Sequence, residues 1–277
     1  MSATAVCPAH LAPETWHFYR EAMTALNASG APYLVGGAYA FERYTGIERH
    51  TKDFDIFCRR EDAEGILELL GSVLGCRTEV TFPHWLGKAY NPGTGDFLDV
   101  IYSSGSGIAV VDEEWFAHAE AASVLGIPAR LCPAEEMIWS KAFIMERERY
   151  DGNDVAHLLH ARAAQLDWER LLRRFDEQWR VLLSHLVLFG FVYPGKRATV
   201  PSWVEEELVR RLQAEAPAPG SRVCRGTLVS RAQYLVDIEK WGYEDARLEP
   251  RIQMSSGDIQ HWTRAIGDQN RRREDHR

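Results

Sequence analysis

The sequence is poor in cysteine, and the five cysteines among its 277 residues follow no metal-binding or redox spacing. None belongs to a CxxC pair, which argues against a zinc site, and their odd number argues against a framework of disulfide bonds. Such frameworks are typical of small secreted domains, so the sequence favours a reducing compartment. The cysteines are Cys7, Cys58, Cys76, Cys132 and Cys224.

The sequence also lacks an excess of positive charge and a long apolar segment. Its formal net charge of −8 does not favour broad binding of nucleic acids, although a local patch can still bind a tRNA end or a small cationic substrate. The longest apolar stretch, residues 181–193, is interrupted by Ser184, His185 and Gly190 and is too short to span a bilayer. The chain does not begin with a basic segment followed by an apolar core, so we expect no signal peptide, no membrane association and a cytoplasmic location.

The hydrophobic pattern changes character at Pro133. A chain of this length suffices for one large domain or two of common size. Before Pro133, short apolar segments of strand type alternate with helical segments, whereas helical periodicity dominates after it. We therefore predict an α+β fold. A small mixed β-sheet core with flanking helices occupies residues 1–132, and a mainly helical domain occupies residues 133–277.

The individual elements follow from periodicity and from the turn residues between them. The predicted strands are residues 32–35, 51–58, 77–82, 97–102 and, at an edge of the sheet, 127–131. The predicted helices of the first part are residues 14–26, 38–44 and 61–74 and a short one that begins at Asp112. Those of the second part are residues 134–149, 153–164, 168–188 and 204–214.

Two glycines, Gly36 and Gly37, stand where the first predicted strand gives way to a helix. Glycine has no Cβ atom, so the backbone there can approach a phosphate group closely. The N-terminus of the following helix offers N–H groups to an anion. The pair is thus a candidate phosphate-binding turn, although a plain tight turn explains it equally well.

Two carboxylates, Asp53 and Asp55, lie two positions apart in the second predicted strand. Residues at this spacing point to the same face of a sheet, so Phe54 and Ile56 are expected to pack on the other face. Neighbouring like charges are unfavourable unless a cation lies between them, and oxygen ligands suit Mg²⁺ or Mn²⁺. A solvated strand face is the alternative explanation.

A third carboxylate, Asp99, lies in the middle of the apolar stretch 97–102. A single charge in a strand built for burial is unfavourable without a partner. If this strand is a neighbour of residues 51–58, Asp99 completes a cluster of three carboxylates with Asp53 and Asp55. Asp96 is a competing candidate, but its place at the edge of a loop favours a role in the turn.

These residues together resemble the nucleotidyltransferase superfamily, whose members share the polymerase-beta-like fold. Its pattern is a Gly-Gly or Gly-Ser turn, a short helix, an Asp-x-Asp strand and a third acidic residue on a later strand. Gly36, Gly37, Asp53, Asp55 and Asp99 match this pattern. Thr51 and Lys52 complete the Thr-x-Asp-x-Asp form that is common in bacterial branches. The resemblance covers about residues 32 to 102.

The resemblance implies a transferase that binds ATP or another nucleoside triphosphate (NTP) together with Mg²⁺ or Mn²⁺. Asp53 and Asp55 would hold two divalent ions that bridge the triphosphate. Asp99 would hold the ion nearer the acceptor and make its attacking hydroxyl more acidic. Gly36 and Gly37 would cradle the phosphates. Thr51 and Lys52 are nucleotide-binding candidates on the same grounds.

A second region resembles a narrower group, the AbiEii-like bacterial proteins. In the stretch Ser140 to Leu158, a lysine in one helix is followed by an arginine-rich turn and an aspartate that begins the next helix. By this likeness Lys141 would contact the triphosphate and Asp154 would support the site. A solvated helix lysine and an ordinary N-terminal helix cap are equally good explanations.

The leading functional hypothesis is transfer of a nucleoside monophosphate from an NTP to an unidentified acceptor, which is a small molecule, a protein or a tRNA. The acidic chain mildly favours a cationic small acceptor. The alternatives are a toxin that modifies tRNA and is held by an antitoxin, or a catalytically silent nucleotide-binding regulator. Four arginines could form a phosphate-binding patch or a solvated helix face. They are Arg170, Arg173, Arg174 and Arg180.

Overall fold

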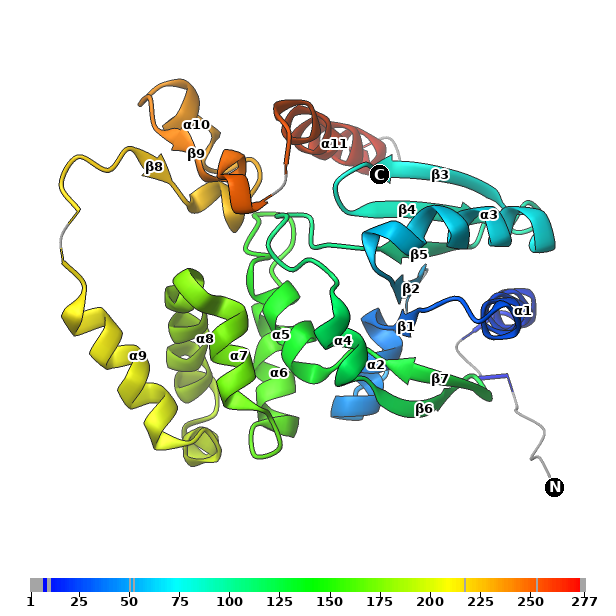
Figure 1. The fold of residues 1–277 in the computed structure, drawn as a ribbon, viewed down its shortest axis with the longest axis horizontal. Helices are drawn as coiled ribbons and strands as arrows, with labels where there is room; N and C mark the ends of the chain where they lie inside the picture. Colours follow the sequence, from blue (N-terminus) through cyan, green and yellow to red (C-terminus); the bar gives the residue numbers. More distant parts are fainter. Residues whose placement is uncertain are drawn as a thin grey trace. The chain divides into compact units, whose positions relative to one another are not determined.

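The computed structural model describes residues 7–8, 11–49, 51, 53–216, 218–252 and 254–274, which form two compact units (Figure 1). The first unit contains the chain up to Gly105 together with Val110–Pro133. The second unit contains Ser106–Ala109 and the chain from Ala134 onward. The predicted α+β class is confirmed, because a mixed sheet with flanking helices is followed by a mainly helical part.

A seven-stranded sheet forms the centre of the first unit, in the order β3-β4-β5-β2-β1-β7-β6. The pairs β2–β5 and β1–β7 are parallel and the other pairs are antiparallel. The strands are β1 (Leu34–Val35), β2 (Asp53–Phe57), β3 (Arg77–Phe82), β4 (Leu86–Tyr90), β5 (Phe97–Ile101), β6 (Glu120–Val124) and β7 (Ile127–Leu131). The helices of this unit are α1 (Pro13–Ser29), α2 (Gly37–Thr45), α3 (Ala63–Leu74) and α4 (Glu113–Ala117).

One face of this sheet is covered by helices, because alternate side chains of the central strands are apolar. Phe54, Ile56, Leu98 and Val100 are completely buried on that face. The helix α3 packs against β3, β4 and β5, and Tyr19 of α1 packs on Phe54 with a ring-centre distance of 4.9 Å. The other side chains of β2 and β5, including all three candidate aspartates, therefore point to the opposite face.

Three strands of the sheet differ from expectation. The sequence pattern did not show β4 or β6, and residues 127–131 were expected at an edge. That expectation is wrong, because β7 lies between β1 and β6. In β4 the small residues Gly87 and Ala89 face the helices, so the strand carries little of the apolar alternation by which strands are recognised. A Cβ atom on Gly87 would lie 2.8 Å from Leu67 of α3, which explains the small residue.

The second unit is mainly helical. It comprises α5 (Ala134–Ala142), α6 (Gly152–Arg162), α7 (Trp168–Phe175), α8 (Trp179–Val192), α9 (Ser202–Ala214), α10 (Leu235–Glu239) and α11 (Ser256–Glu274), and a two-stranded parallel ladder of β8 (Val223–Cys224) and β9 (Glu244–Asp245). The helix α5 packs on α6, α7 and α8. Among the described residues, no helix is both long enough and apolar enough to cross a membrane.

Two predicted helices of this unit are shorter than expected. The helix predicted over 134–149 ends at Ala142, because Met145 and Tyr150 pair in a bridge and the chain turns back on itself. The helix predicted over 168–188 is two helices, separated at Asp176, whose φ of 40° lies outside the helical region. A positive φ at a non-glycine residue carries no sequence signal of the kind that Gly or Pro gives.

A short segment, Ser106–Ala109, leaves the first unit directly after the β5 region and returns to it at Val110. It packs tightly within the second unit. A Cβ atom on Gly107, whose φ is +75°, would lie only 2.7 Å from the carbonyl oxygen of Ile252. The chain therefore passes between the two units three times.

Candidate active site

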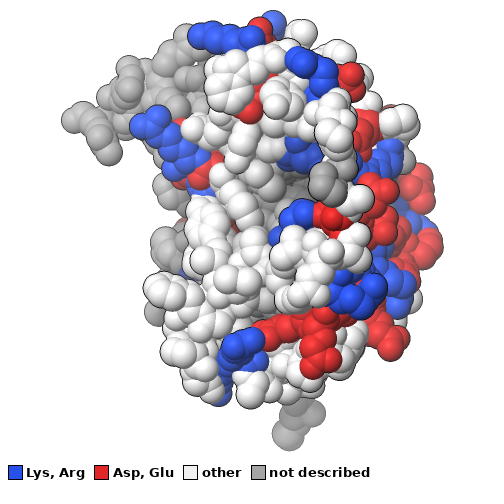
Figure 2. Space-filling view, turned by 90° about the vertical axis from the view of Figure 1, so that its left-hand side faces the viewer, with Lys and Arg blue, Asp and Glu red and all other residues white. Residues whose placement is uncertain are grey.

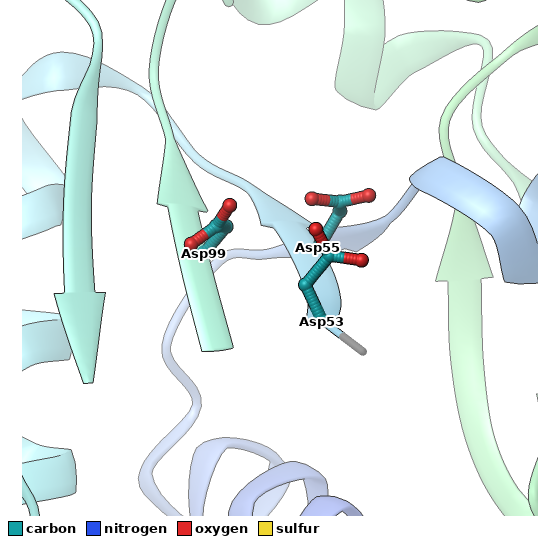
Figure 3. Close-up of side chains that lie close together, drawn as sticks. All are labelled: Asp53, Asp55 and Asp99. Carbon is teal, nitrogen blue, oxygen red and sulfur yellow. The ribbon is translucent and has the colours of Figure 1, made fainter. Parts of the chain in front are cut away.

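The three candidate aspartates lie together on the face of the sheet that β2 and β5 share (Figure 3). The parallel pairing of the two strands places Asp55 directly opposite Asp99, and Asp53 points to the same face as Asp55. One carboxylate oxygen from each residue lies within 4.8 Å of the others. Asp99 is buried, with 8% of its surface exposed, and the other two are half-buried. Three carboxylates this close repel one another, so the cluster favours a cation.

A lysine that the sequence pattern did not reveal lies beside this cluster. Lys88 of β4 is the antiparallel partner of Asp99, and its Nζ atom lies 2.5 Å from Asp99 Oδ1. The same ammonium group lies 4.0 Å from the centre of the Phe97 ring. Recognition of β4 as a strand next to β5 would have been needed to find Lys88 from the sequence.

Thr51 lies next to the cluster, as its place before the first aspartate suggested. Its hydroxyl donates a hydrogen bond to the Asp53 carboxylate and contacts the Asp53 carbonyl oxygen at 3.1 Å. Thr51 therefore fixes the orientation of the Asp53 side chain. Lys52, the neighbouring nucleotide-binding candidate, lies outside the described residues.

The glycine turn adjoins the carboxylates. The N–H of Gly36 donates to the carbonyl oxygen of Asp55 at 3.0 Å, and α2 begins at Gly37. Gly37 has a φ of +52°, and a Cβ atom there would lie 1.7 Å from Asp55 Oδ2. A Cβ on Gly36 would lie 2.3 Å from the ring of Phe57. Both positions therefore require glycine, and the backbone of Gly37 lies against the Asp55 carboxylate.

Two tyrosines lie beneath the cluster and add no negative charge to it. Burial, followed by the charges of nearby groups that include Asp53, raises the pKa of both Tyr19 and Tyr39 above the usual tyrosine range. Both hydroxyls keep their protons at neutral pH, and both rings pack on Phe54.

Asp96, the competing acidic residue, accepts hydrogen bonds from Thr15 and Thr94 at 2.9 and 2.6 Å, as suits a residue of the turn.

Lys141 and Asp154 belong to the second unit, where they are bound to each other. Lys141 Nζ lies 2.8 Å from Asp154 and 2.9 Å from Asp151. Arg149 also pairs with Asp151, at 2.9 Å. Burial acts to raise the pKa of Asp151, but the hydrogen bonds and charges of Arg149 and Lys141 outweigh it and lower this pKa to about 2. This network holds the start of α6 against α5.

Three of the four arginines considered as a phosphate-binding patch pair with carboxylates of the chain. Arg170 is buried and Arg174 is half-buried; both pair with Glu136, and Arg170 also lies 2.6 Å from Glu135. Arg180 pairs with Glu215. Basic and acidic side chains alternate along much of the charged surface that Figure 2 shows. Arg170 and Arg174 are therefore part of the helical core, because each neutralises a buried carboxylate.

Residues 225–247 are held in place by packing within the second unit. Arg247 is completely buried and pairs with Asp245 at 2.6 Å. Arg231 pairs with Glu146 at 3.0 Å. A Cβ atom on Gly226 would lie 2.3 Å from the ring of Tyr234. These contacts give the segment a structural role that the sequence did not reveal.

Comparison with known proteins finds similarity among solved structures alone. No protein-family model matches the chain, and a search of curated proteins finds no match. Similar solved structures include the antibiotic-resistance factor ANT(2'')-Ia, which is 18% identical, covers 63% of this chain and 98% of that one, and has a TM-score of 0.43. The lincosamide antibiotic adenylyltransferase LnuA is 12% identical, with coverages of 53% and 96% and a TM-score of 0.36. A nucleotidyltransferase-like antigen from Paracoccidioides brasiliensis is 13% identical, with coverages of 68% and 93% and a TM-score of 0.42.

These similar structures include an adenylyltransferase and a nucleotidyltransferase-like protein. The narrower resemblance to AbiEii-like proteins is not confirmed. Both the sequence identities and the TM-scores are low. The function therefore has to be argued from the residues of this chain.

Proposed function

We propose that the chain is a metal-dependent nucleotidyltransferase that moves a nucleoside monophosphate from an NTP to an acceptor. The proposal rests mainly on the cluster of Asp53, Asp55 and Asp99 on one face of two neighbouring strands. The Gly36-Gly37 turn adjoins it and leaves no room for a side chain. Carboxylates beside a glycine turn at a helix N-terminus can hold metal ions and phosphate groups together.

The donor set fits Mg²⁺ or Mn²⁺. All three side chains offer carboxylate oxygens, which these hard cations prefer, and among the residues that the structure describes no sulfur or nitrogen ligand belongs to the cluster. Oxygens that share one Mg²⁺ ion lie at most ~4.2 Å apart, since each bond is ~2.1 Å long. The carboxylate oxygens of the cluster lie within 4.8 Å of one another, and small side-chain rotations would bring them within that limit. When bound, the ions would neutralise phosphate charge and make the attacking hydroxyl more acidic.

Each residue has a defined part in this proposal. Asp53, oriented by Thr51, and Asp55 hold the ions that carry the triphosphate. Asp99, on the neighbouring strand, would hold the ion nearer the acceptor and make its attacking hydroxyl more acidic. The backbone of Gly36 and Gly37 contacts the phosphates.

The remaining candidates have supporting parts in the same proposal. Lys52 contributes to nucleotide binding. Lys141 contacts the triphosphate, and Asp154 supports Lys141, to which it is already bound at 2.8 Å. We assign the transfer chemistry to residues 1–132 and a part in acceptor recognition to residues 133–277.

A transfer assay tests this function directly. The protein is incubated with each labelled NTP, ATP first, with Mg²⁺ or Mn²⁺, and with cationic small molecules, tRNA or protein as acceptors. We expect the Asp53→Asn and Asp99→Asn variants to lose at least about 10²–10³-fold in transfer rate, because each loses a charge on which the transition state depends. Asp96→Asn is the matched control, since Asp96 lies outside the cluster and serves the turn. Retention of transfer by both cluster variants would overturn the assignment.

A further inference from the structure

Lys88 gives the carboxylate cluster a cation that belongs to the protein itself. The antiparallel pairing of β4 with β5 sets Lys88 opposite Asp99. Its ammonium group is held on two sides, by Asp99 Oδ1 at 2.5 Å and by the ring of Phe97 at 4.0 Å. The side chains of Lys88 and Asp99 are 17% and 12% exposed, so water screens this pair only partly.

This contact changes the charge that a metal ion meets at Asp99. The three carboxylates carry three negative charges when ionised, and Lys88 adds one positive charge next to the carboxylate of Asp99. A divalent ion bound to Asp99 would lie within ~5 Å of the ammonium group and be repelled by it. An incoming triphosphate brings negative charge of its own, which offsets that repulsion.

We propose that Lys88 is a positioning residue that makes metal binding at Asp99 depend on the arrival of the nucleotide. In the nucleotide-free protein Lys88 holds the Asp99 carboxylate in place and weakens metal binding there. When the triphosphate is present, its charge allows the metal ion and Lys88 to lie together around Asp99. This inference rests on the proposed function, because it concerns the same metal and nucleotide site.

Titration of Mn²⁺ in the presence and absence of a non-hydrolysable NTP tests the inference without any acceptor. Lys88→Gln keeps a hydrogen-bond donor beside Asp99 but removes the charge, and Lys88→Arg keeps the charge. We expect Lys88→Gln to bind Mn²⁺ at least about tenfold more tightly than the wild type without nucleotide, and less than about threefold more tightly with it. Lys88→Arg should behave like the wild type, and so should Lys196→Met, which removes an exposed lysine of the second unit.

A thermal measurement adds a second readout. Without metal, Lys88→Gln should have a lower Tm than the wild type, because its carboxylates lack the cation, and Mn²⁺ should raise its Tm by more. Equal Mn²⁺ affinities of the wild type and Lys88→Gln without nucleotide would overturn the role of Lys88 and leave the proposed function standing. If the wild type binds no Mn²⁺ under either condition, the proposed function fails as well.

Discussion

The backbone of Gly37 leaves no room for a side chain beside the Asp55 carboxylate, and this leads to the sharpest prediction. In Gly37→Ala the new Cβ atom would lie 1.7 Å from Asp55 Oδ2 and 2.6 Å from its Cγ atom. Ordinary contact needs at least 3.4 Å, so the carboxylate or the turn must move by about 1.7 Å. Displacements near 1 Å in a catalytic arrangement cost about 10²-fold in rate. We expect a loss of about that size in transfer and of about 10- to 100-fold in Mn²⁺ affinity.

Gly46→Ala is a matched control for this change. Gly46 ends the helix that Gly37 begins and has a φ of +71°, but a Cβ atom there would meet nothing within 4 Å. Both variants therefore share the conformational penalty of a positive φ, about 1–2 kcal/mol of the free energy of unfolding, which urea unfolding measures. The steric displacement of the Asp55 carboxylate distinguishes them.

The comparison separates a lost site from a weakened fold. Gly46→Ala should keep the Mn²⁺ affinity and transfer rate of the wild type in spite of its lower stability. If Gly37→Ala binds Mn²⁺ as tightly as Gly46→Ala does, the Asp55 carboxylate is not a metal ligand in the arrangement described, and the reasoning is refuted.

Two further predictions concern the helical unit. Burial lowers the pKa of His185 below its usual value of about 6.5. As the pH falls, the unfolded chain therefore binds a proton at this histidine before the folded chain does. The free energy of unfolding should then drop by up to about 1.4 kcal/mol per pH unit below pH 6.5. His185→Gln should remove this slope in urea unfolding, whereas the exposed His17→Gln should leave it; an unchanged slope in His185→Gln contradicts the prediction. Lys141→Met should lower the free energy of unfolding by about 3–5 kcal/mol, because Asp151 and Asp154 lose their shared cation, and Lys141→Arg should recover most of it. If Lys141 also contacts the triphosphate as proposed, the KM for the NTP should rise at least about tenfold in Lys141→Met; an unchanged KM would leave it a structural role alone.

The carboxylate pattern was predictable because strand geometry is simple. Alternation alone places Asp53 and Asp55 on one face, and the structure buries Phe54 and Ile56 completely on the other. What the sequence left open was which strands are neighbours. The pairing of β2 with β5 connects segments more than 40 residues apart, and no local preference encodes it. The roles of these residues stay predictions until the variants are tested.

Lys88 was missed for a physical reason. In β4 the helix-covered positions hold Gly87 and Ala89, because α3 leaves little room above them, and the larger side chains point to the face of the aspartates. A buried strand face is recognised in a sequence by its large apolar side chains. In β4 the face covered by helices carries the small residues instead, so the pattern is absent. The roles of Lys141 and Asp154 were open for another reason, since a lysine in a helix and an aspartate at a helix start fit many environments.

The segment Ser106–Ala109 belongs to the second unit although the residues on both sides of it belong to the first, and this affects how the protein can be divided into fragments. A fragment that stops at Pro133 would carry this segment without the carbonyl of Ile252 against which Gly107 is packed. A fragment that starts at Ala134 would contain Ile252 but lose the segment. Cleavage at a single peptide bond therefore cannot yield both units whole. Independent expression of the first unit would require a short replacement loop between Gly105 and Val110, and complementation between two separately expressed units would report the docking of this segment within the second unit.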